Sequence, residues 1–164
     1  MLALGIDPGT ASLGYGLVRE FDDGSLACVD YGVIRTKADA AMPQRLKHIY
    51  DELVVLVERC QPGRAAVEEL FFSRNVTTAI TVAQARGVVL LALQSAGLPI
   101  AEYKPNAIKQ SLTGYGGADK SQMQEMVRLL LALEQRPRPD DAADALAVAI
   151  ADLQHYRLAS FNAE

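Results

Sequence analysis

The sequence contains no tryptophan, two cysteines and two histidines, and each shortage excludes some chemistry. Cys28 and Cys60 form neither a CxxC pair nor a disulfide framework, so a reducing, cytoplasmic compartment is expected. His48 and His155 fall in predicted helices without the spacing of metal ligands. A zinc site that depends on cysteine or histidine therefore lacks its usual ligands.

The sequence also lacks the patterns of a membrane span and of a targeting signal. No uninterrupted apolar run approaches the ~20 residues that cross a bilayer. The N-terminus has no basic stretch before its first apolar residues, which a signal peptide would require. We therefore expect no membrane partner and a single domain over residues 1–164, a typical domain length.

The net charge of −4 hides an uneven distribution of basic residues. Residues 70–120 carry five basic and two acidic side chains, a net charge of +3. These are Arg74, Arg86, Lys104, Lys109 and Lys120 against Glu102 and Asp119. Local charge determines what a surface attracts, so this segment is a candidate for binding nucleic acid, with an ordinary solvated surface as the alternative.

Hydrophobic periodicity predicts strands first and helices last. Strands are expected at residues 2–6, 13–19, 26–35, 65–68 and 99–103, with a hairpin turn at residues 22–25. Helices are expected at residues 43–60, 75–96, 106–112, 120–133 and 140–156. This order predicts a mixed five-stranded α/β sheet with helices on both faces. Active sites in such sheets lie at the carboxyl ends of the strands.

Four carboxylates lie at the start or end of predicted elements, in stretches that are otherwise apolar or tightly turning. They are Asp7, Glu68, Asp141 and Asp144. A charge in such a setting costs several kcal/mol unless it is paired or binds a metal. Together, the four predict a site assembled from distant parts of the chain, as a two-metal phosphodiesterase requires.

The two strand-end carboxylates also have ordinary structural explanations. Asp7 precedes a Pro-Gly pair and would suit an Asx-type turn. Glu68 could face solvent at the edge of a strand, and Glu69 should point to the opposite side because side chains alternate. At most one of this glutamate pair is therefore expected to face the site.

The start of the last helix offers Asp140, Asp141 and Asp144. Acidic residues in a first turn cap free amides and suit the helix dipole, which explains Asp140 or Asp141 without any metal. Asp144 lies deeper, among alanines, and shares a helix face with Asp141. The Asp141 and Asp144 pair is therefore the better candidate for metal binding, although spacing alone leaves the choice between Asp140 and Asp141 open.

Carboxylate oxygens without nearby histidine or cysteine favour Mg²⁺ or Mn²⁺ over Zn²⁺. Such ions activate water and stabilise both oxygens of an in-line displacement at phosphorus. Beside the proposed site, Phe71, Arg74 and Asn75 could stack on an unpaired base and hold a phosphate, unless the phenylalanine belongs to the core. The glycine-rich residues 114–117 are not a P-loop, but they could deliver Lys120 to a phosphate.

Several short motifs, in the same order along nearly the whole chain, resemble those of the bacterial RuvC family. They are residues 6–9 (IDPG), Val67 and Glu68 with Phe71 and Asn75, residues 84–87 (QARG), Lys109 and Gln110, Gly116 with Lys120 and Ser121, and residues 141–147 (DAADALA). Members of this family are Holliday junction resolvases with a ribonuclease H-like fold. The resemblance implies the same fold for this chain.

The resemblance also implies a function. The chain is expected to be a Mg²⁺-dependent, structure-selective endonuclease that acts on four-way DNA junctions in recombination and repair. It would work as a homodimer, make two symmetric cuts that leave 5′-phosphate ends, and cooperate with the RuvAB branch-migration complex.

The resemblance further implies roles for individual residues. The catalytic residues, which would hold two metal ions, are Asp7, Glu68, Asp141 and Asp144. This choice favours Asp141 over Asp140, and the position of Asp7 on the central strand favours it as the ligand shared by both ions. The implied DNA contacts are a base-stacking Phe71 with Arg74, Asn75, Lys109 and Lys120.

Three other functions are considered. An actin-like ATPase or sugar kinase would need a second phosphate loop like residues 7–10, and the chain has one copy. A ribonuclease H-like RNA-processing nuclease would use the same carboxylates on a different substrate. A non-catalytic DNA-binding or scaffold protein would not need four converging carboxylates.

The expected homodimer points to the predicted helix at residues 75–96. This helix has more apolar residues than one buried stripe requires. Ala79, Ala83 and Gly87 are spaced four apart and would let a second copy of the helix approach closely. The alternative is a fully buried core helix in a monomer.

Overall fold

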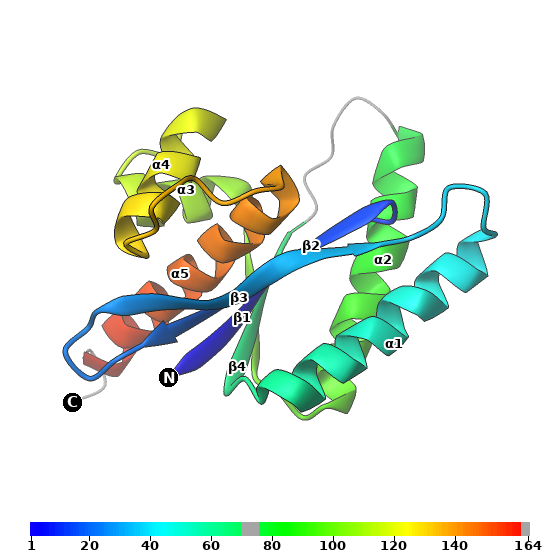
Figure 1. The fold of residues 1–164 in the computed structure, drawn as a ribbon, viewed down its shortest axis with the longest axis horizontal. Helices are drawn as coiled ribbons and strands as arrows, with labels where there is room; N and C mark the ends of the chain where they lie inside the picture. Colours follow the sequence, from blue (N-terminus) through cyan, green and yellow to red (C-terminus); the bar gives the residue numbers. More distant parts are fainter. Residues whose placement is uncertain (70–75, 162–164) are drawn as a thin grey trace.

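A mixed five-stranded sheet forms the centre of the protein and is covered by helices on both faces (Figure 1). The computed structural model describes residues 1–69 and 76–161. The strands are β1 (Leu2–Asp7), β2 (Ser12–Glu20), β3 (Leu26–Arg35), β4 (Arg64–Glu68) and β5 (Ile100–Tyr103). The helices are α1 (Met42–Cys60), α2 (Val76–Ser95), α3 (Pro105–Thr113), α4 (Lys120–Leu130) and α5 (Asp140–Phe161).

The strand order across the sheet is β3-β2-β1-β4-β5, so β1 is the central strand, as predicted. β1 pairs antiparallel with β2 and parallel with β4, and β4 pairs parallel with β5. The predicted turn joins β2 to β3, where the Ser25 backbone N–H donates to the Asp23 carboxylate at 2.9 Å. The carboxyl ends of β1, β3, β4 and β5 therefore lie along one edge of the sheet, which we call the site edge.

The sheet separates two hydrophobic cores, because successive side chains of a strand point to opposite faces. Along β1, Leu4 and Ile6 pack with α1 and α2, whereas Ala3 packs with α5 on the other side. Figure 1 shows this division, with α1 and α2 on one face and α3, α4 and α5 on the other.

Helix α5 packs so closely on the sheet that three strand residues, Gly5, Gly14 and Gly16, must lack a side chain. A Cβ atom added at Gly5 on β1 would overlap the backbone carbonyl oxygen of Ala145. One added at Gly14 on β2 would overlap the carbonyl oxygen of Asp141. The alanine-rich face of α5 is buried against these glycines, so the start of α5 lies directly over the end of β1.

A buried charge holds the middle of α5 in place. The Asp152 carboxylate is completely buried and accepts hydrogen bonds from the Arg64 guanidinium on β4, at 2.5 and 2.8 Å. The Tyr103 hydroxyl on β5 donates to the same carboxylate at 2.9 Å. Since removal of one partner would leave an uncompensated buried charge, this network ties α5 to the two parallel strands.

Two helix ends differ from those predicted by more than one residue. α4 ends at Leu130 instead of residue 133, because Ala132 has a positive φ of 50° that no α-helix continues. α5 extends to Phe161 instead of residue 156, since its last turns contact the sheet through an ion pair between Arg157 and Glu20 at 3.2 Å.

Among the described residues, one helix, α2, is long and apolar enough by length and composition to cross a membrane. This helix contains no long uninterrupted apolar run, because Arg86 and several polar residues divide it. Only 28% of its most apolar 18-residue window is buried. The chain therefore leaves an unusually apolar helix surface uncovered.

We predict that Gly14→Ala destabilises the fold by about 1–3 kcal/mol, because the new methyl group must displace the α5 backbone. Gly116→Ala is the matched control, since its Cβ would meet no atom closer than 3.7 Å. Urea unfolding of both variants checks this. Equal stabilities would show that α5 can shift away from β2 at no cost.

Candidate metal centre

Three carboxylates meet at the site edge of the sheet. Asp7 is the last residue of β1, and Asp141 and Asp144 lie in the first turns of α5. One oxygen from each side chain can be chosen so that all three lie within 4.8 Å of one another. The residues are far apart in sequence and are brought together by the close packing of α5 on the sheet.

Glu68, the fourth predicted carboxylate, ends β4 directly beside Asp7. β4 runs parallel to β1, and Val67 pairs with Ile6, so the two strands end side by side. The Glu68 and Asp7 carboxyl groups lie close enough for the Glu68 charge to raise the pKa of Asp7. Glu68 also lines two cavities, one of about 220 Å³ shared with Asp7 and one of about 240 Å³ shared with Asp144.

The electrostatics of the cluster oppose its own ionisation. Burial, followed by the charges of Glu68, Asp144 and Asp141, raises the pKa of Asp7 from 3.8 to about 8. Burial likewise raises the pKa of Glu68 and of Asp144, although nearby lysines partly counteract this. A site that holds several half-buried carboxylates needs positive charge before all of them can ionise near neutral pH.

The donor set fits a divalent cation that prefers oxygen ligands. Every candidate ligand is a carboxylate, and no cysteine or histidine belongs to the described cluster. This composition matches Mg²⁺ or Mn²⁺ better than Zn²⁺. Such an ion would supply the compensating charge that the raised pKa values call for.

The structure places the two neighbouring aspartates at the start of α5 in different surroundings. Asp141 belongs to the carboxylate cluster. Asp140 instead pairs with the Lys120 ammonium at 3.2 Å and accepts a hydrogen bond from Gln124 at 3.0 Å. The choice that sequence spacing left open therefore follows from packing, with Asp141 directed into the cluster.

Lys120 brings a positive charge to the cluster. α4 begins at this residue, after a capping box in which the Asp119 side chain accepts from the Gln122 backbone. The Lys120 ammonium lies 3.4 Å from the Asp144 carboxylate. Lys109, on α3, lines the 240 Å³ cavity that Glu68 shares with Asp144, and the apolar Met123 lines it as well.

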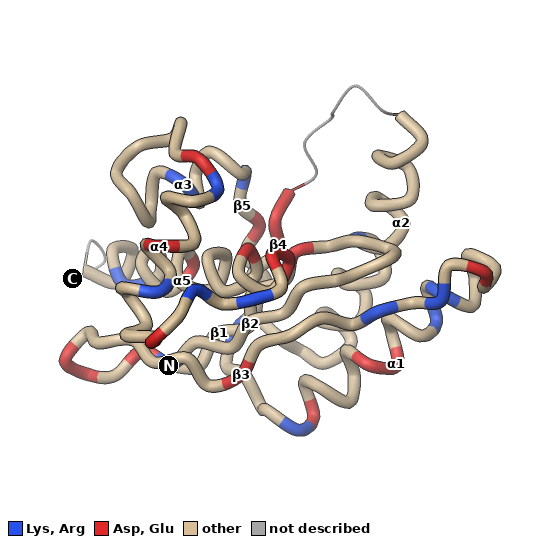
Figure 2. The backbone as a smooth tube through the Cα atoms, turned by 45° about the horizontal axis from the view of Figure 1, so that its top comes forward, with Lys and Arg blue, Asp and Glu red and all other residues tan. Residues whose placement is uncertain are grey.

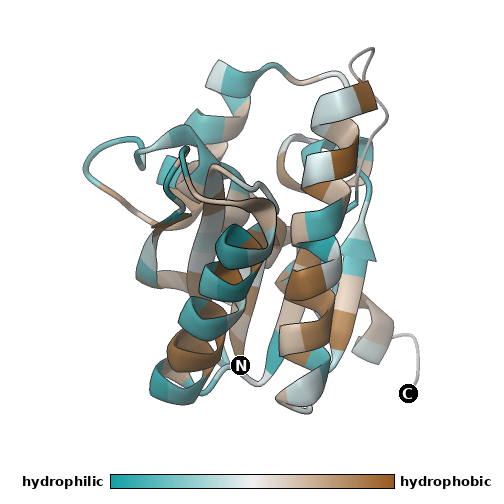
Figure 3. Ribbon diagram, turned by 90° about the vertical axis from the view of Figure 1, so that its right-hand side faces the viewer, coloured by the Kyte–Doolittle hydropathy of each residue, from teal (hydrophilic) through white to brown (hydrophobic). Residues whose placement is uncertain are grey.

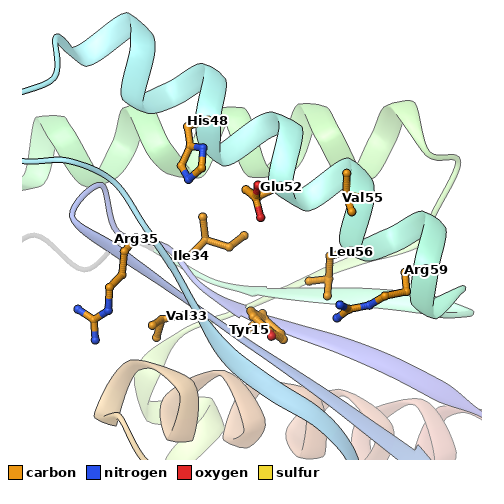
Figure 4. A pocket seen from close by; sticks show the side chains of 9 residues that line it. All are labelled: Tyr15, Val33, Ile34, Arg35, His48, Glu52, Val55, Leu56 and Arg59. Atoms are coloured by element: carbon orange, nitrogen blue, oxygen red, sulfur yellow. The ribbon is translucent and has the colours of Figure 1, made fainter.

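Other predicted positions lie outside the cluster or outside the described residues. Phe71, Arg74 and Asn75 fall in residues 70–75, which the structure does not describe. The His155 ring stacks on Tyr103, with ring centroids 5.1 Å apart. His48 lines a cavity of about 190 Å³ between β3 and α1, away from the carboxylates (Figure 4).

Two residues that were not predicted as site residues lie near the carboxylates. Arg86 lines the 220 Å³ cavity, donates to the Glu68 backbone carbonyl at 3.4 Å and pairs with Glu102. It is the only charged residue in α2, a signal that could have identified it. Glu69 also lines this cavity, although strand alternation predicts that its side chain points to the opposite side from that of Glu68.

Comparisons with known proteins agree with this arrangement. Residues 3–152 match the family model described as crossover junction endodeoxyribonuclease RuvC. A protein of that name from Chloroflexus aggregans is 63% identical over 150 residues, which cover 92% of this chain and 91% of that protein.

Two solved structures are similar over almost the whole chain. Thermus thermophilus RuvC has a TM-score of 0.90 at 36% identity, with 97% of each chain covered. The same organism's RuvC in complex with a Holliday junction substrate has a TM-score of 0.88 at 34% identity, with 96% of each chain covered. These matches confirm the ribonuclease H-like fold that the motifs implied.

We predict that without metal the protein becomes less stable as the pH rises from about 4 to about 8. The folded state holds the Asp7 proton more tightly than the unfolded state does, so ionisation favours unfolding across this range. The loss should reach at most about 1.4 kcal/mol per pH unit. Asp7→Asn should remove the Asp7 contribution to this loss and make the variant the more stable protein at pH 8, while Glu68 and Asp144 still contribute.

Urea unfolding in EDTA at several pH values measures this difference. Asp51→Asn is the control, since Asp51 lies on α1 in an exposed pair with Lys47. A constant difference between wild type and Asp7→Asn across the range would contradict the prediction.

Proposed function

Because the chain belongs to the RuvC family of crossover junction endodeoxyribonucleases, we propose that it cuts four-way DNA junctions. The observation that carries this proposal is the carboxylate cluster at the site edge. Asp7, Asp141 and Asp144 each offer an oxygen within 4.8 Å of the others, with Glu68 beside them. Cutting two strands of like polarity symmetrically would resolve the junction during recombination and repair.

The four carboxylates fit two Mg²⁺ ions, for which Mn²⁺ would substitute. Asp7, on the central strand, would be shared, Glu68 would hold one ion, and the pair from α5 would hold the other. When bound, the ions supply an activated water and stabilise charge on the phosphate oxygens. The cut would leave a 5′-phosphate and a 3′-hydroxyl.

The lysines beside the cluster are suited to hold the scissile strand. Lys109 and Lys120 line the cavity next to Asp144, where a phosphate could approach both ammonium groups. Lys120 is held by Asp140 and Asp144 through exposed contacts, which a phosphate can replace. Base stacking by Phe71 and contacts from Arg74 and Asn75 stay predictions.

Symmetric cutting requires two sites, and the uncovered surface of α2 supports a homodimer. Figure 3 shows apolar residues along α2 on the side facing the viewer, next to the more polar α1. The exposed positions recur every three or four residues and so form one stripe. They are Val76, Ile80, Ala83, Gly87 and Leu91.

Two small residues support close approach of a second helix. Ala83 is exposed, and a Cβ added at Gly87 would meet no atom within 4 Å, so the chain's own packing does not require this glycine. Ala79, predicted to share the stripe, is only 7% exposed and belongs to the buried side of α2. The proposed interface therefore uses Ala83 and Gly87 without Ala79.

Two further expectations rest on membership of the family. A RuvAB branch-migration complex would deliver junctions to the enzyme. Work on DNA agrees with a location in the cytoplasm.

We predict that Asp7→Asn and Glu68→Gln reduce cutting of a synthetic four-way junction to below a tenth of wild type while binding persists or tightens. Each variant loses a metal ligand, and each also loses a negative charge that repels phosphate. Nicking and gel-shift assays with and without Mg²⁺ measure the two effects separately.

Asp51→Asn, far from the cluster, should cut normally and control for the loss of a carboxylate. Residual cutting above a tenth in either site variant would remove that residue from the metal centre. Cleavage of structured RNA in preference to junction DNA would instead support an RNA-processing nuclease.

We predict that Ala83→Glu converts the dimer to a monomer, because two like charges would meet near the two-fold axis. Sedimentation equilibrium at micromolar concentration tests this. Val55→Glu places the same side chain at an exposed apolar position on α1 and should leave the dimer intact. A monomeric wild type would eliminate both the interface and coordinated cutting.

A further inference from the structure

The basic side chains of the described residues fall into two groups. Eight form ion pairs with carboxylates: Lys47, Arg59, Arg64, Arg86, Lys120, Arg128, Arg136 and Arg157. Seven others have no such pair within the described part of the chain: Arg19, Arg35, Lys37, Arg45, Lys104, Lys109 and Arg138. Unpaired cations are the ones free to neutralise a polyanion without first giving up a partner.

Six of these seven unpaired cations gather at the site edge. Lys104 directly follows β5, Lys109 lies in α3, and Arg138 precedes α5. Arg35 ends β3 at the opposite side of the sheet, and Lys37 and Arg45 follow it. The exception is Arg19 on β2, which lies opposite Leu2 of β1 in the sheet register and therefore at the far edge of the sheet.

We call Arg35, Lys37 and Arg45 the second flank. In the strand order, β3 and β5 are the two outer strands, and Asp7 and Glu68 end the central strand β1 and its neighbour β4. Cations that form no ion pair within the described residues therefore lie on both sides of the carboxylates. Lys104 and Lys109 border one side, and the second flank borders the other.

Hydrogen bonds hold the second flank against the turn that follows Asp7. The Thr36 hydroxyl donates to the Thr10 backbone carbonyl at 2.5 Å. The Arg45 guanidinium donates to the Thr36 hydroxyl at 2.7 Å, which joins the start of α1 to the same turn. The flank therefore has a defined position relative to the metal centre.

Its two exposed cations, Arg35 and Lys37, form no ion pair with any acidic side chain that the structure describes. Figure 4 shows the Arg35 side chain directed away from His48 and Glu52 on α1, although all three line one cavity. Figure 2 shows the basic segments where β3 runs toward α1. Asp39 is the one acidic residue between Arg35 and Lys47, and it is exposed.

We propose that the second flank binds backbone phosphates of a duplex arm of the junction, several base pairs from the cut. The proposal rests on the proposed function and adds a binding surface to it. Arg35 and Lys37 would contact the phosphates, while Arg45 would position the segment through Thr36.

The dimensions of the sheet agree with a duplex lying along the site edge. Neighbouring strands are about 4.8 Å apart, so two spacings separate β3 from β1 by roughly 10 Å. This corresponds to about three base pairs of B-DNA at 3.4 Å each. With the reach of the side chains, contacts are expected about three to six nucleotides from the scissile phosphate.

The test combines a protein change with a DNA change. Arg35→Ala/Lys37→Ala and wild type are titrated with a four-way junction, and with the same junction carrying uncharged methylphosphonates about three to six nucleotides from the cut. The double variant should bind the normal junction at least roughly tenfold more weakly at 0.1 M salt, with a log–log salt slope smaller by about 0.9 per lost contact. Neutral linkages should weaken wild type but not the double variant.

Arg19→Ala is the matched control, since Arg19 is also exposed and unpaired but lies at the far edge. It should behave as wild type on both DNAs. The cutting rate of the double variant at saturating protein should stay unchanged, because the second flank binds DNA without joining the chemistry.

The outcomes are separable. Three results would contradict DNA binding by the second flank. The neutral linkages could weaken wild type and the double variant equally, or the salt dependence of binding could be the same in both proteins. The double variant could also cut more slowly than wild type at saturating protein. Wild type that does not prefer the four-way junction over plain duplex would instead overturn the proposed function.

Discussion

The close contact between α5 and the centre of the sheet is the constraint on which the site depends. Gly5 and Gly14 leave no side chain between the strands and the helix backbone, so the first turns of α5 lie over the end of β1. Farther along, the buried Asp152 is held by Arg64 and Tyr103 from the neighbouring strands. Packing at one end and a hydrogen-bonded charge at the other together determine where the aspartates of α5 point.

This packing creates a concentration of like charge that the protein does not neutralise by itself. Asp7 is the most strongly affected group, because burial and three neighbouring carboxylates all disfavour its ionised form. Lys120 provides only partial compensation, through exposed contacts with Asp140 and Asp144. The fold thus gives up some stability near neutral pH in order to hold these carboxylates together, a trade that is typical of functional sites.

Charge is organised around this centre in a way that the net charge of −4 conceals. Away from the site edge, most cations are paired with carboxylates and contribute little to attraction at a distance. Along the site edge, the unpaired cations border the carboxylates on both sides. An arrangement of this kind attracts a phosphate backbone while directing one phosphate toward the acidic centre.

Sequence patterns alone predicted the element types, their order, the hairpin turn and the four carboxylates that we propose for the metal centre. Local periodicity and turn chemistry carry that information, because they depend on residues that are neighbours in the chain. Family motifs added the fold and the choice of Asp141, which spacing left open.

Contacts between segments that are remote in the sequence follow only from the tertiary structure. In the folded protein, Asp141 belongs to the carboxylate cluster, whereas Asp140 pairs with Lys120. Arg86 contacts the Glu68 backbone, and Ala79 lies on the buried side of α2. The tertiary structure also determined which cations are paired, since an ion pair requires two side chains from different elements to approach within about 4 Å. A linear pattern records the charges, but only the packed elements set the distances between them.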